Sequence, residues 1–159
     1  MGHRCGRDDA VRGREVIIMP IHDGGCLCGK VRFRVTAAAL DSGYCHCRMC
    51  QRNSGAPVVA WATFPATGFA WIAGNAAEYP SSAHATRRFC ASCGSYLVFS
   101  STTSPEEISV NTASFDTPEV FPPRKHIFVE AGFRGFIQRT NCPRMLVTEP
   151  GEAAGARNG

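Results

Sequence analysis

The chain has 159 residues and a formal net charge of +4, with 44% hydrophobic and 19% charged residues. This length allows one domain with a buried core and falls short of two comfortable ones. No apolar run reaches the roughly 18 residues that a membrane helix needs. The basic residues are scattered and form no patch with interleaved aromatic residues, which argues against nucleic-acid binding.

Residues 1–22 are rich in Arg and Gly and show little hydrophobic periodicity. We therefore expect a disordered N-terminal extension there, with Met19 as an alternative start to Met1. Its apolar stretch, VIIMPI, is too short for a secretory signal, so a cytoplasmic protein is expected. Residues 23–148 form the single expected domain, and residues 149–159 are expected to be a flexible tail.

Between those ends the sequence predicts β-strands. The stretch GKVRFRV, residues 30–35 with Gly29 before them, alternates basic residues with Val and Phe, which is the period of a half-buried strand. Further short strands are predicted at 57–64, 68–72, 95–100, 107–111 and 125–131. Only one short helical turn is expected, from Cys50 to Ser54. The predicted fold is mainly β: a small, mostly antiparallel β-sheet domain.

Nine cysteines are the dominant chemical feature of the sequence. In a reducing compartment disulfides do not persist, and clustered cysteines then indicate metal ligands or catalytic thiols. The odd count also argues against a closed disulfide framework. The nine are Cys5, Cys26, Cys28, Cys45, Cys47, Cys50, Cys90, Cys93 and Cys142.

Two spaced pairs of cysteines lie beside predicted strands. They are Cys26-x-Cys28 and Cys90-x-x-Cys93, and each pair is followed directly by a glycine. Glycine lets the backbone fold tightly enough to aim two thiolates at one ion. Together the pairs would complete a tetrahedral four-cysteine zinc site, a kind of site that is normally closed and structural. It would tie the first strand to a strand in the middle of the chain.

The third cluster, Cys45-His46-Cys47-x-x-Cys50, places three thiolates within reach of one metal. Three protein ligands with an exchangeable fourth position are the arrangement of catalytic zinc sites. The alternative is a second structural zinc with Cys142 or a histidine as the fourth ligand. Spacing alone does not assign the ligands, because the seven cysteines could also divide between the two sites in another way.

The order of these motifs resembles the glutathione-dependent formaldehyde-activating enzyme family, which includes the centromere protein V relatives. The pattern runs from Cys-x-Cys through Cys-His-Cys-x-x-Cys and NSGAP (53–57) to Arg-x-Phe-Cys-x-x-Cys-Gly (87–94) and HIFV (126–129). It covers roughly residues 24–129 and includes seven cysteines. The chain departs from the family pattern beyond Glu130, where the family usually has a Trp and a later acidic-Leu-Pro-like segment. If that part of the chain shapes the ligand pocket, the substrate could differ from that of the family.

The resemblance implies an Mss4-like β fold with two zinc sites. Cys26, Cys28, Cys90 and Cys93 would hold a structural ion, and Cys45, Cys47 and Cys50 a labile, catalytic, substrate-facing one. The implied activity is that of a carbon–sulfur lyase of the S-(hydroxymethyl)glutathione synthase type, which joins glutathione to formaldehyde. The expected partner is a small thiol or aldehyde, with glutathione as substrate or cosubstrate. No association with a membrane is expected.

Four residues near the third cluster are candidates for supporting roles. Arg48 and Arg52 flank the cluster and could bind the carboxylates of glutathione through forked contacts, although an arginine in such a place is also commonly just solvated. His46 is expected either to shuttle a proton or to support the site structurally. His126 is expected to pack or form hydrogen bonds and not to catalyse.

A function of a different class stays open beside the enzyme. The chain could be a non-catalytic zinc-stabilised binding module, as the centromere protein V relatives suggest. In that case both metal sites would be closed by four protein ligands, and an exposed surface would carry the function. The open-looking third cluster favours the enzyme, and the sequence predicts no oligomeric state.

Overall fold

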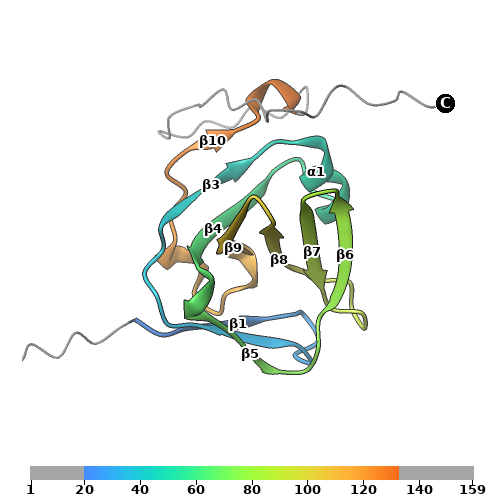
Figure 1. Cartoon of the computed structure of the whole chain (residues 1–159). Helices are drawn as coiled ribbons and strands as arrows, with labels where there is room; N and C mark the ends of the chain where they lie inside the picture. Colours follow the sequence, from blue (N-terminus) through green and yellow to red (C-terminus); the bar gives the residue numbers. More distant parts are fainter. Residues whose placement is uncertain (1–19, 133–159) are drawn as a thin grey trace, which may run out of the picture.

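A computed structural model of the chain describes residues 20–132. Within this range ten strands form two sheets, and there is one short α-helix (Figure 1). The small sheet has the strand order β1-β2-β5, and the large sheet has the order β10-β3-β4-β9-β8-β7-β6. Neighbouring strands are antiparallel except β10 and β3, which are parallel. The expectation of a mainly β domain built from small antiparallel sheets is confirmed.

The small sheet consists of β1 (His22–Gly25), β2 (Arg32–Val35) and β5 (Phe69–Ala73). The large sheet consists of β3 (Asp41–Cys45), β4 (Val59–Pro65), β6 (Ala77–Ser82), β7 (Ala85–Phe89), β8 (Tyr96–Ser101), β9 (Ser104–Asn111) and β10 (His126–Ile127). The helix α1 spans Arg48–Ser54. Four 3-10 turns, η1 to η4, span Ala66–Gly68, Thr112–Ser114, Pro118–Val120 and Val129–Ala131.

The core lies where the small sheet crosses one end of the curled large sheet (Figure 1). Strand β2 supplies Phe33 and Val35, which are both fully buried. Arg32 and Arg34, which alternate with them along the strand, are only half-buried. The period-2 pattern of the sequence therefore places one face of β2 in the core. Phe33 meets Phe115 edge to face, with ring centroids 5.1 Å apart. This aromatic packing joins the small sheet to the segment that follows β9.

Among the predicted elements that differ in extent from the structure, two lie near the third cluster. The strand expected over 125–131 is confined to β10, because Phe128 takes a left-handed backbone conformation (φ 55°, ψ 42°) that ends it. The helical turn expected from Cys50 begins earlier, because Cys47 caps the N-terminus of α1 by accepting a hydrogen bond from the Cys50 amide at 3.3 Å. Gly55, with φ 69°, ends the helix.

Several expectations fall on the ends of the chain. Of the extension expected over residues 1–22, the part before residue 20 lies outside the described residues, and His22 begins β1. The tail 149–159 and Cys142 also lie outside the described residues, so these expectations stay predictions. Within residues 20–132, no helix is long and apolar enough to cross a membrane.

Candidate metal centres

Four cysteines converge where the β1–β2 loop meets the β7–β8 loop. The sulfur atoms of Cys26, Cys28, Cys90 and Cys93 all lie within 4.8 Å of one another. Two of these distances are 3.5 Å (Cys26 to Cys28) and 3.8 Å (Cys28 to Cys90). Zinc–sulfur bonds of about 2.3 Å require sulfurs about 3.8 Å apart in a tetrahedron, so these four thiols fit a zinc ion. We name them the four-cysteine centre.

The two loops of the four-cysteine centre have matching backbone turns. The amide of Gly29 donates to the carbonyl of Cys26 at 3.0 Å, and the amide of Gly94 donates to the carbonyl of Cys90 at 2.8 Å. Both glycines have positive φ (74° and 75°), a conformation that residues with a Cβ rarely adopt. Each turn thereby directs its two thiols toward the other turn, as the glycines in the sequence predict.

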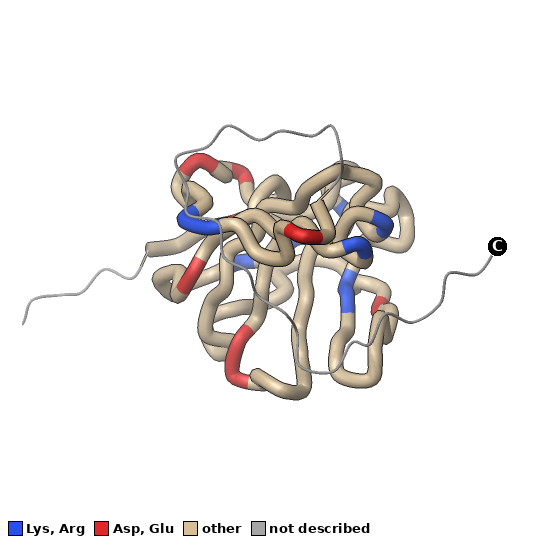
Figure 2. The backbone as a smooth tube through the Cα atoms, turned by 90° about the horizontal axis from the view of Figure 1, so that it is seen from above, with Lys and Arg blue, Asp and Glu red and all other residues tan. Residues whose placement is uncertain are grey.

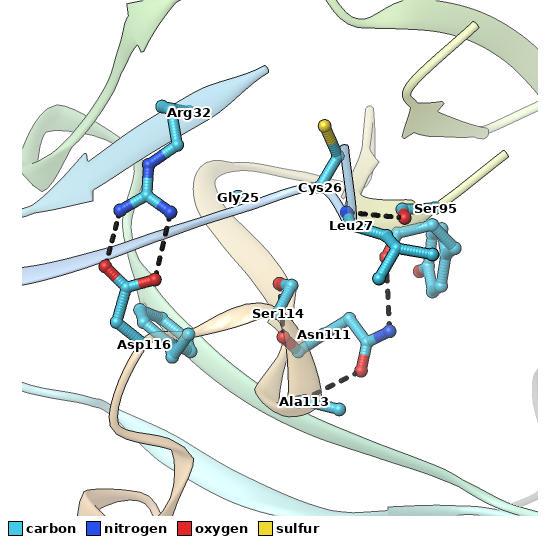
Figure 3. A pocket seen from close by; sticks show the side chains of 11 residues that line it. Gly25, Cys26, Leu27, Arg32, Ser95, Asn111, Ala113, Ser114 and Asp116 are labelled. Atoms are coloured by element: carbon cyan, nitrogen blue, oxygen red, sulfur yellow. Dashed lines mark hydrogen bonds and ion pairs between the residues drawn. The ribbon is translucent and has the colours of Figure 1, made fainter. Parts of the chain in front are cut away.

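The four-cysteine centre links the two sheets at an exposed edge of the molecule. Cys26 and Cys90 are buried, but Cys28 is exposed. The amide of Leu27 donates to Ser95 Oγ at 3.0 Å across the same junction. Beside it lies a hollow of about 390 Å³ whose wall includes the ion pair between Arg32 and Asp116 (Figure 3). A metal here would therefore crosslink the two sheets at a junction that the hydrogen bond from Leu27 already spans.

Three further cysteines converge at the other end of the large sheet, around α1 (Figure 1). Cys45 ends β3, Cys47 precedes α1, and Cys50 lies in the first turn of the helix. Their sulfur atoms lie within 4.8 Å of one another, which fits three corners of a tetrahedral zinc site. Within the described part of the chain, no His, Asp or Glu joins this group. We name it the three-cysteine centre.

The structure therefore divides the seven cysteines into groups of four and three, the division that spacing left open. Hydrogen bonds with Cys45 and Cys50, together with the Cys50 amide and the charge of Arg87, lower the pKa of Cys47 to about 2 in spite of its burial. Hydrogen bonds with Cys47 and Cys50, and burial, raise the pKa of Cys45. Within the cluster, the surroundings of Cys47 therefore favour its thiolate, and those of Cys45 favour its neutral thiol.

Arg87 of β7 faces the three-cysteine centre from the sheet. This residue is only 3% exposed, and both terminal nitrogens of its guanidinium lie 3.8 Å from Cys50 Sγ. One of them also donates to the hydroxyl of Tyr96 at 3.3 Å. In the sequence, Arg87 is only one position of the Arg-x-Phe-Cys motif, and no role was predicted for it. Strand alternation was the available signal, because successive arginines in a strand point to opposite faces.

The two arginines proposed from the sequence as carboxylate binders lie on α1. Arg48 and Arg52 are both exposed. Arg48 donates a hydrogen bond to the side chain of Gln51 in the same helix. Both side chains are thus on the helix that carries Cys50, and their role toward a substrate stays a prediction.

The two histidines form a buried pair next to the three-cysteine centre. His46 and His126 are 7% and 2% exposed, and their ring nitrogens Nε2 and Nδ1 lie 2.8 Å apart. This contact confirms that His126 packs and forms hydrogen bonds. Gln51 Nε2 donates to the carbonyls of His46 at 2.7 Å and Ala131 at 3.2 Å. The middle of α1 is therefore tied to the residue that follows β3 and to η4, the turn after β10.

Comparison with known proteins agrees with this arrangement of cysteines. The family model described as "Glutathione-dependent formaldehyde-activating enzyme" matches residues 21–131. The chain belongs to this family. The matched range contains all seven cysteines of the two centres, so the resemblance inferred from the motifs is confirmed.

Two individual relatives extend the comparison. An uncharacterized lyase of Schizosaccharomyces pombe is 28% identical over 97 residues, which cover 61% of this chain and 70% of the relative. The crystal structure of a Rhodobacter sphaeroides protein, a structural-genomics target, matches with a TM-score of 0.52 and 24% identity. That match covers 77% of this chain and 99% of the other. The second relative supports the fold alone.

Proposed function

We propose that this chain is a zinc-dependent carbon–sulfur lyase that acts on a small thiol and an aldehyde at the three-cysteine centre. Glutathione and formaldehyde are the substrates that its family suggests, in a reaction of the S-(hydroxymethyl)glutathione synthase type. The observation that carries the proposal is the convergence of only three ligand atoms, among the described residues, at Cys45, Cys47 and Cys50. Because zinc completes a tetrahedron with four ligands, three leave one position for a substrate.

The residues around the centre suit this chemistry. Bound zinc would supply a Lewis acid and would favour the thiolate form of a thiol in the fourth position. Cys45, Cys47 and Cys50 would hold the ion, each from a different backbone environment. Arg48 and Arg52, exposed on α1, would bind the carboxylates of glutathione. Positioning of the two reactants contributes to the rate independently of acidity.

The comparisons support an enzyme of this class. A relative named as a lyase matches over 61% of this chain, and the family model is named for formaldehyde activation. Acidic and basic residues are interspersed over the described backbone (Figure 2). That distribution suits a small substrate better than a polyanion, whose binding requires a concentrated basic surface.

The test must separate catalysis from the addition of thiols to formaldehyde that proceeds without help. Exchange between glutathione and its hydroxymethyl adduct would be followed by NMR at equilibrium, with zinc-loaded full-length protein. We expect the wild-type protein to accelerate exchange in proportion to its concentration. Cys47→Ser should abolish the acceleration, and Cys5→Ser, which removes a thiol outside the proposed ligands, should retain it.

Two results would contradict the proposal. A wild-type protein that binds two zinc ions and leaves the exchange rate unchanged would support the binding module instead. Acceleration that survives in Cys47→Ser would place the chemistry away from the three-cysteine centre.

A further inference from the structure

A buried cation faces the three-cysteine centre without a carboxylate partner among residues 20–132. The guanidinium of Arg87 has four recorded neighbours: the sulfur of Cys50, the hydroxyl of Tyr96, and the aromatic rings of Tyr96 and Phe99. The carbon of the guanidinium lies 5.7 Å and 5.2 Å from the centroids of these two rings. Ring faces and a hydroxyl attract a cation but supply no compensating charge.

Burying an isolated cation is costly, so a buried arginine normally has an anionic partner. The sulfur of Cys50 is the contact of Arg87 that becomes a thiolate when it ligates a metal, because a metal-bound thiol is deprotonated. Both terminal nitrogens lie at the same distance, 3.8 Å, from its sulfur, which is the forked approach that a guanidinium uses toward an anion.

The charges of a loaded centre match this arrangement. Three thiolates and one divalent zinc ion sum to one negative charge. One guanidinium brings that sum to zero in a site whose cysteines are buried or half-buried. In a medium of low dielectric constant, such a balance has a larger effect than it would at the surface.

We propose that Arg87 is a positioning residue that neutralises the three-cysteine zinc centre through Cys50 and thereby raises the affinity of this centre for zinc. The inference rests on the metal site of the proposed function, and it does not depend on the identity of the substrate. It also separates the two centres, because Arg87 contacts a ligand of one and no recorded ligand of the other.

The neighbouring residue provides a matched control. Arg88 follows Arg87 in β7, and strand alternation points its side chain to the opposite face. Its guanidinium pairs with Glu78 at 2.7 Å and donates to Ser100 Oγ at 2.9 Å. Replacing either arginine by methionine removes one positive charge from the same strand and leaves an unbranched side chain at that position.

The experiment measures zinc affinity by competition with a chromogenic chelator, on full-length protein and without thiol or aldehyde. For Arg87→Met we expect the weaker-bound zinc to be removed at a chelator concentration at least about tenfold lower than for the wild type. Partners of metal ligands commonly contribute about 10–100-fold to affinity. Arg87→Lys, which keeps the charge, should recover part of this loss. Arg88→Met should match the wild type, and the circular dichroism spectrum and the tighter-bound zinc should persist in all three.

Each alternative outcome is decisive. Unchanged zinc affinity in Arg87→Met would overturn the inference while leaving the proposed function intact. Loss of both zinc ions and of the fold in Arg87→Met, Arg87→Lys and Arg87→Gln alike would show that Arg87 acts only in core packing, which also overturns it. A wild-type protein that binds a single zinc would overturn the proposed function together with the inference.

Discussion

The two cysteine centres differ in ligand number, in burial and in what they connect. The four-cysteine centre has an exposed ligand, Cys28, and joins two sheets through loops that are distant in sequence. The three-cysteine centre is formed by neighbouring residues, contains no exposed ligand, and lies beside the buried Arg87. The more accessible site is therefore the one whose tetrahedron is complete.

From this contrast we propose that ligand number, and not solvent exposure, separates a structural zinc from an exchangeable one. A complete set of four thiolates leaves no position for an incoming ligand, even at the surface. A set of three leaves such a position even when the thiols are sheltered. The position of each centre supports the same proposal, because of the two only the four-cysteine centre brings together loops of separate sheets.

The largest expected effect is the loss of the fold in Cys90→Ser. Binding of a structural zinc contributes about 10–16 kcal/mol in small zinc domains, which is comparable to the whole stability of a domain, about 5–15 kcal/mol. Cys90 is 1% exposed and belongs to the core cluster as well as to the centre. Circular dichroism should show loss of the β spectrum, and elemental analysis should show loss of both zinc ions. A folded variant with one zinc would remove the distinction between the centres.

Cys47→Ser should instead lose one zinc and keep the fold. A serine at this position can still cap α1, because its hydroxyl can accept the hydrogen bond that the Cys50 amide now donates to sulfur. Native mass spectrometry should find a single zinc, and thermal unfolding should remain cooperative. Unfolding as extensive as that of Cys90→Ser would contradict the account.

Gln51→Leu should cause a smaller loss that is confined to the surroundings of the three-cysteine centre. The substitution removes the donor to the carbonyls of His46 and Ala131, and unsatisfied buried acceptors cost about 1–3 kcal/mol. Urea unfolding of the zinc-loaded protein should show a loss of this size. Asn53→Leu, at an exposed position of the same helix, is the control and should change stability little.

The smallest expected effect concerns the ion pair beside the four-cysteine centre. A hydrogen bond from Arg32 lowers the pKa of Asp116, and the two side chains are 31% and 51% exposed. A depressed pKa stabilises the fold above the unfolded-state pKa, and this stabilisation disappears as the pH falls through the folded-state pKa. Exposed pairs contribute about 0–1 kcal/mol. Asp116→Asn should therefore lower the free energy of unfolding by at most that amount at pH 7 and leave it unchanged in strong acid, as urea unfolding at the two pH values would show. An equal loss at both pH values would contradict the ion pair as its cause.

The sequence predicted the strands with clear alternation and missed those without it. Strand β2 alternates apolar and basic residues and was predicted close to its observed bounds. Strand β3 was missed because its sequence, DSGYC, has no apolar period; it pairs with β4 on one side and β10 on the other. Strand β6 contains Pro80, which argues against a strand in sequence, and it is tolerated at the edge of the sheet.

For the site, cysteine spacing predicted two spaced pairs and one cluster, but it left open how the seven cysteines divide between two centres and did not reveal the surroundings of each centre. The pairing of Cys26-x-Cys28 with Cys90-x-x-Cys93 follows from two similar turns, and short-range spacing carries that information. Arg87 approaches Cys50 from a strand far along the chain, and such a contact depends on sheet order. Local sequence does not encode it beyond the alternation of successive arginines.

The measurement that tests the central claim most directly is exchange of bound zinc against isotopically enriched zinc, followed by native mass spectrometry of the full-length protein. The account predicts two zinc ions per chain, one of which exchanges rapidly and faster still with glutathione, while the other persists as long as the protein stays folded. In Cys47→Ser only the persistent ion should remain. Two ions that exchange at the same rate, with or without glutathione, would contradict the division into a structural and a substrate-binding centre.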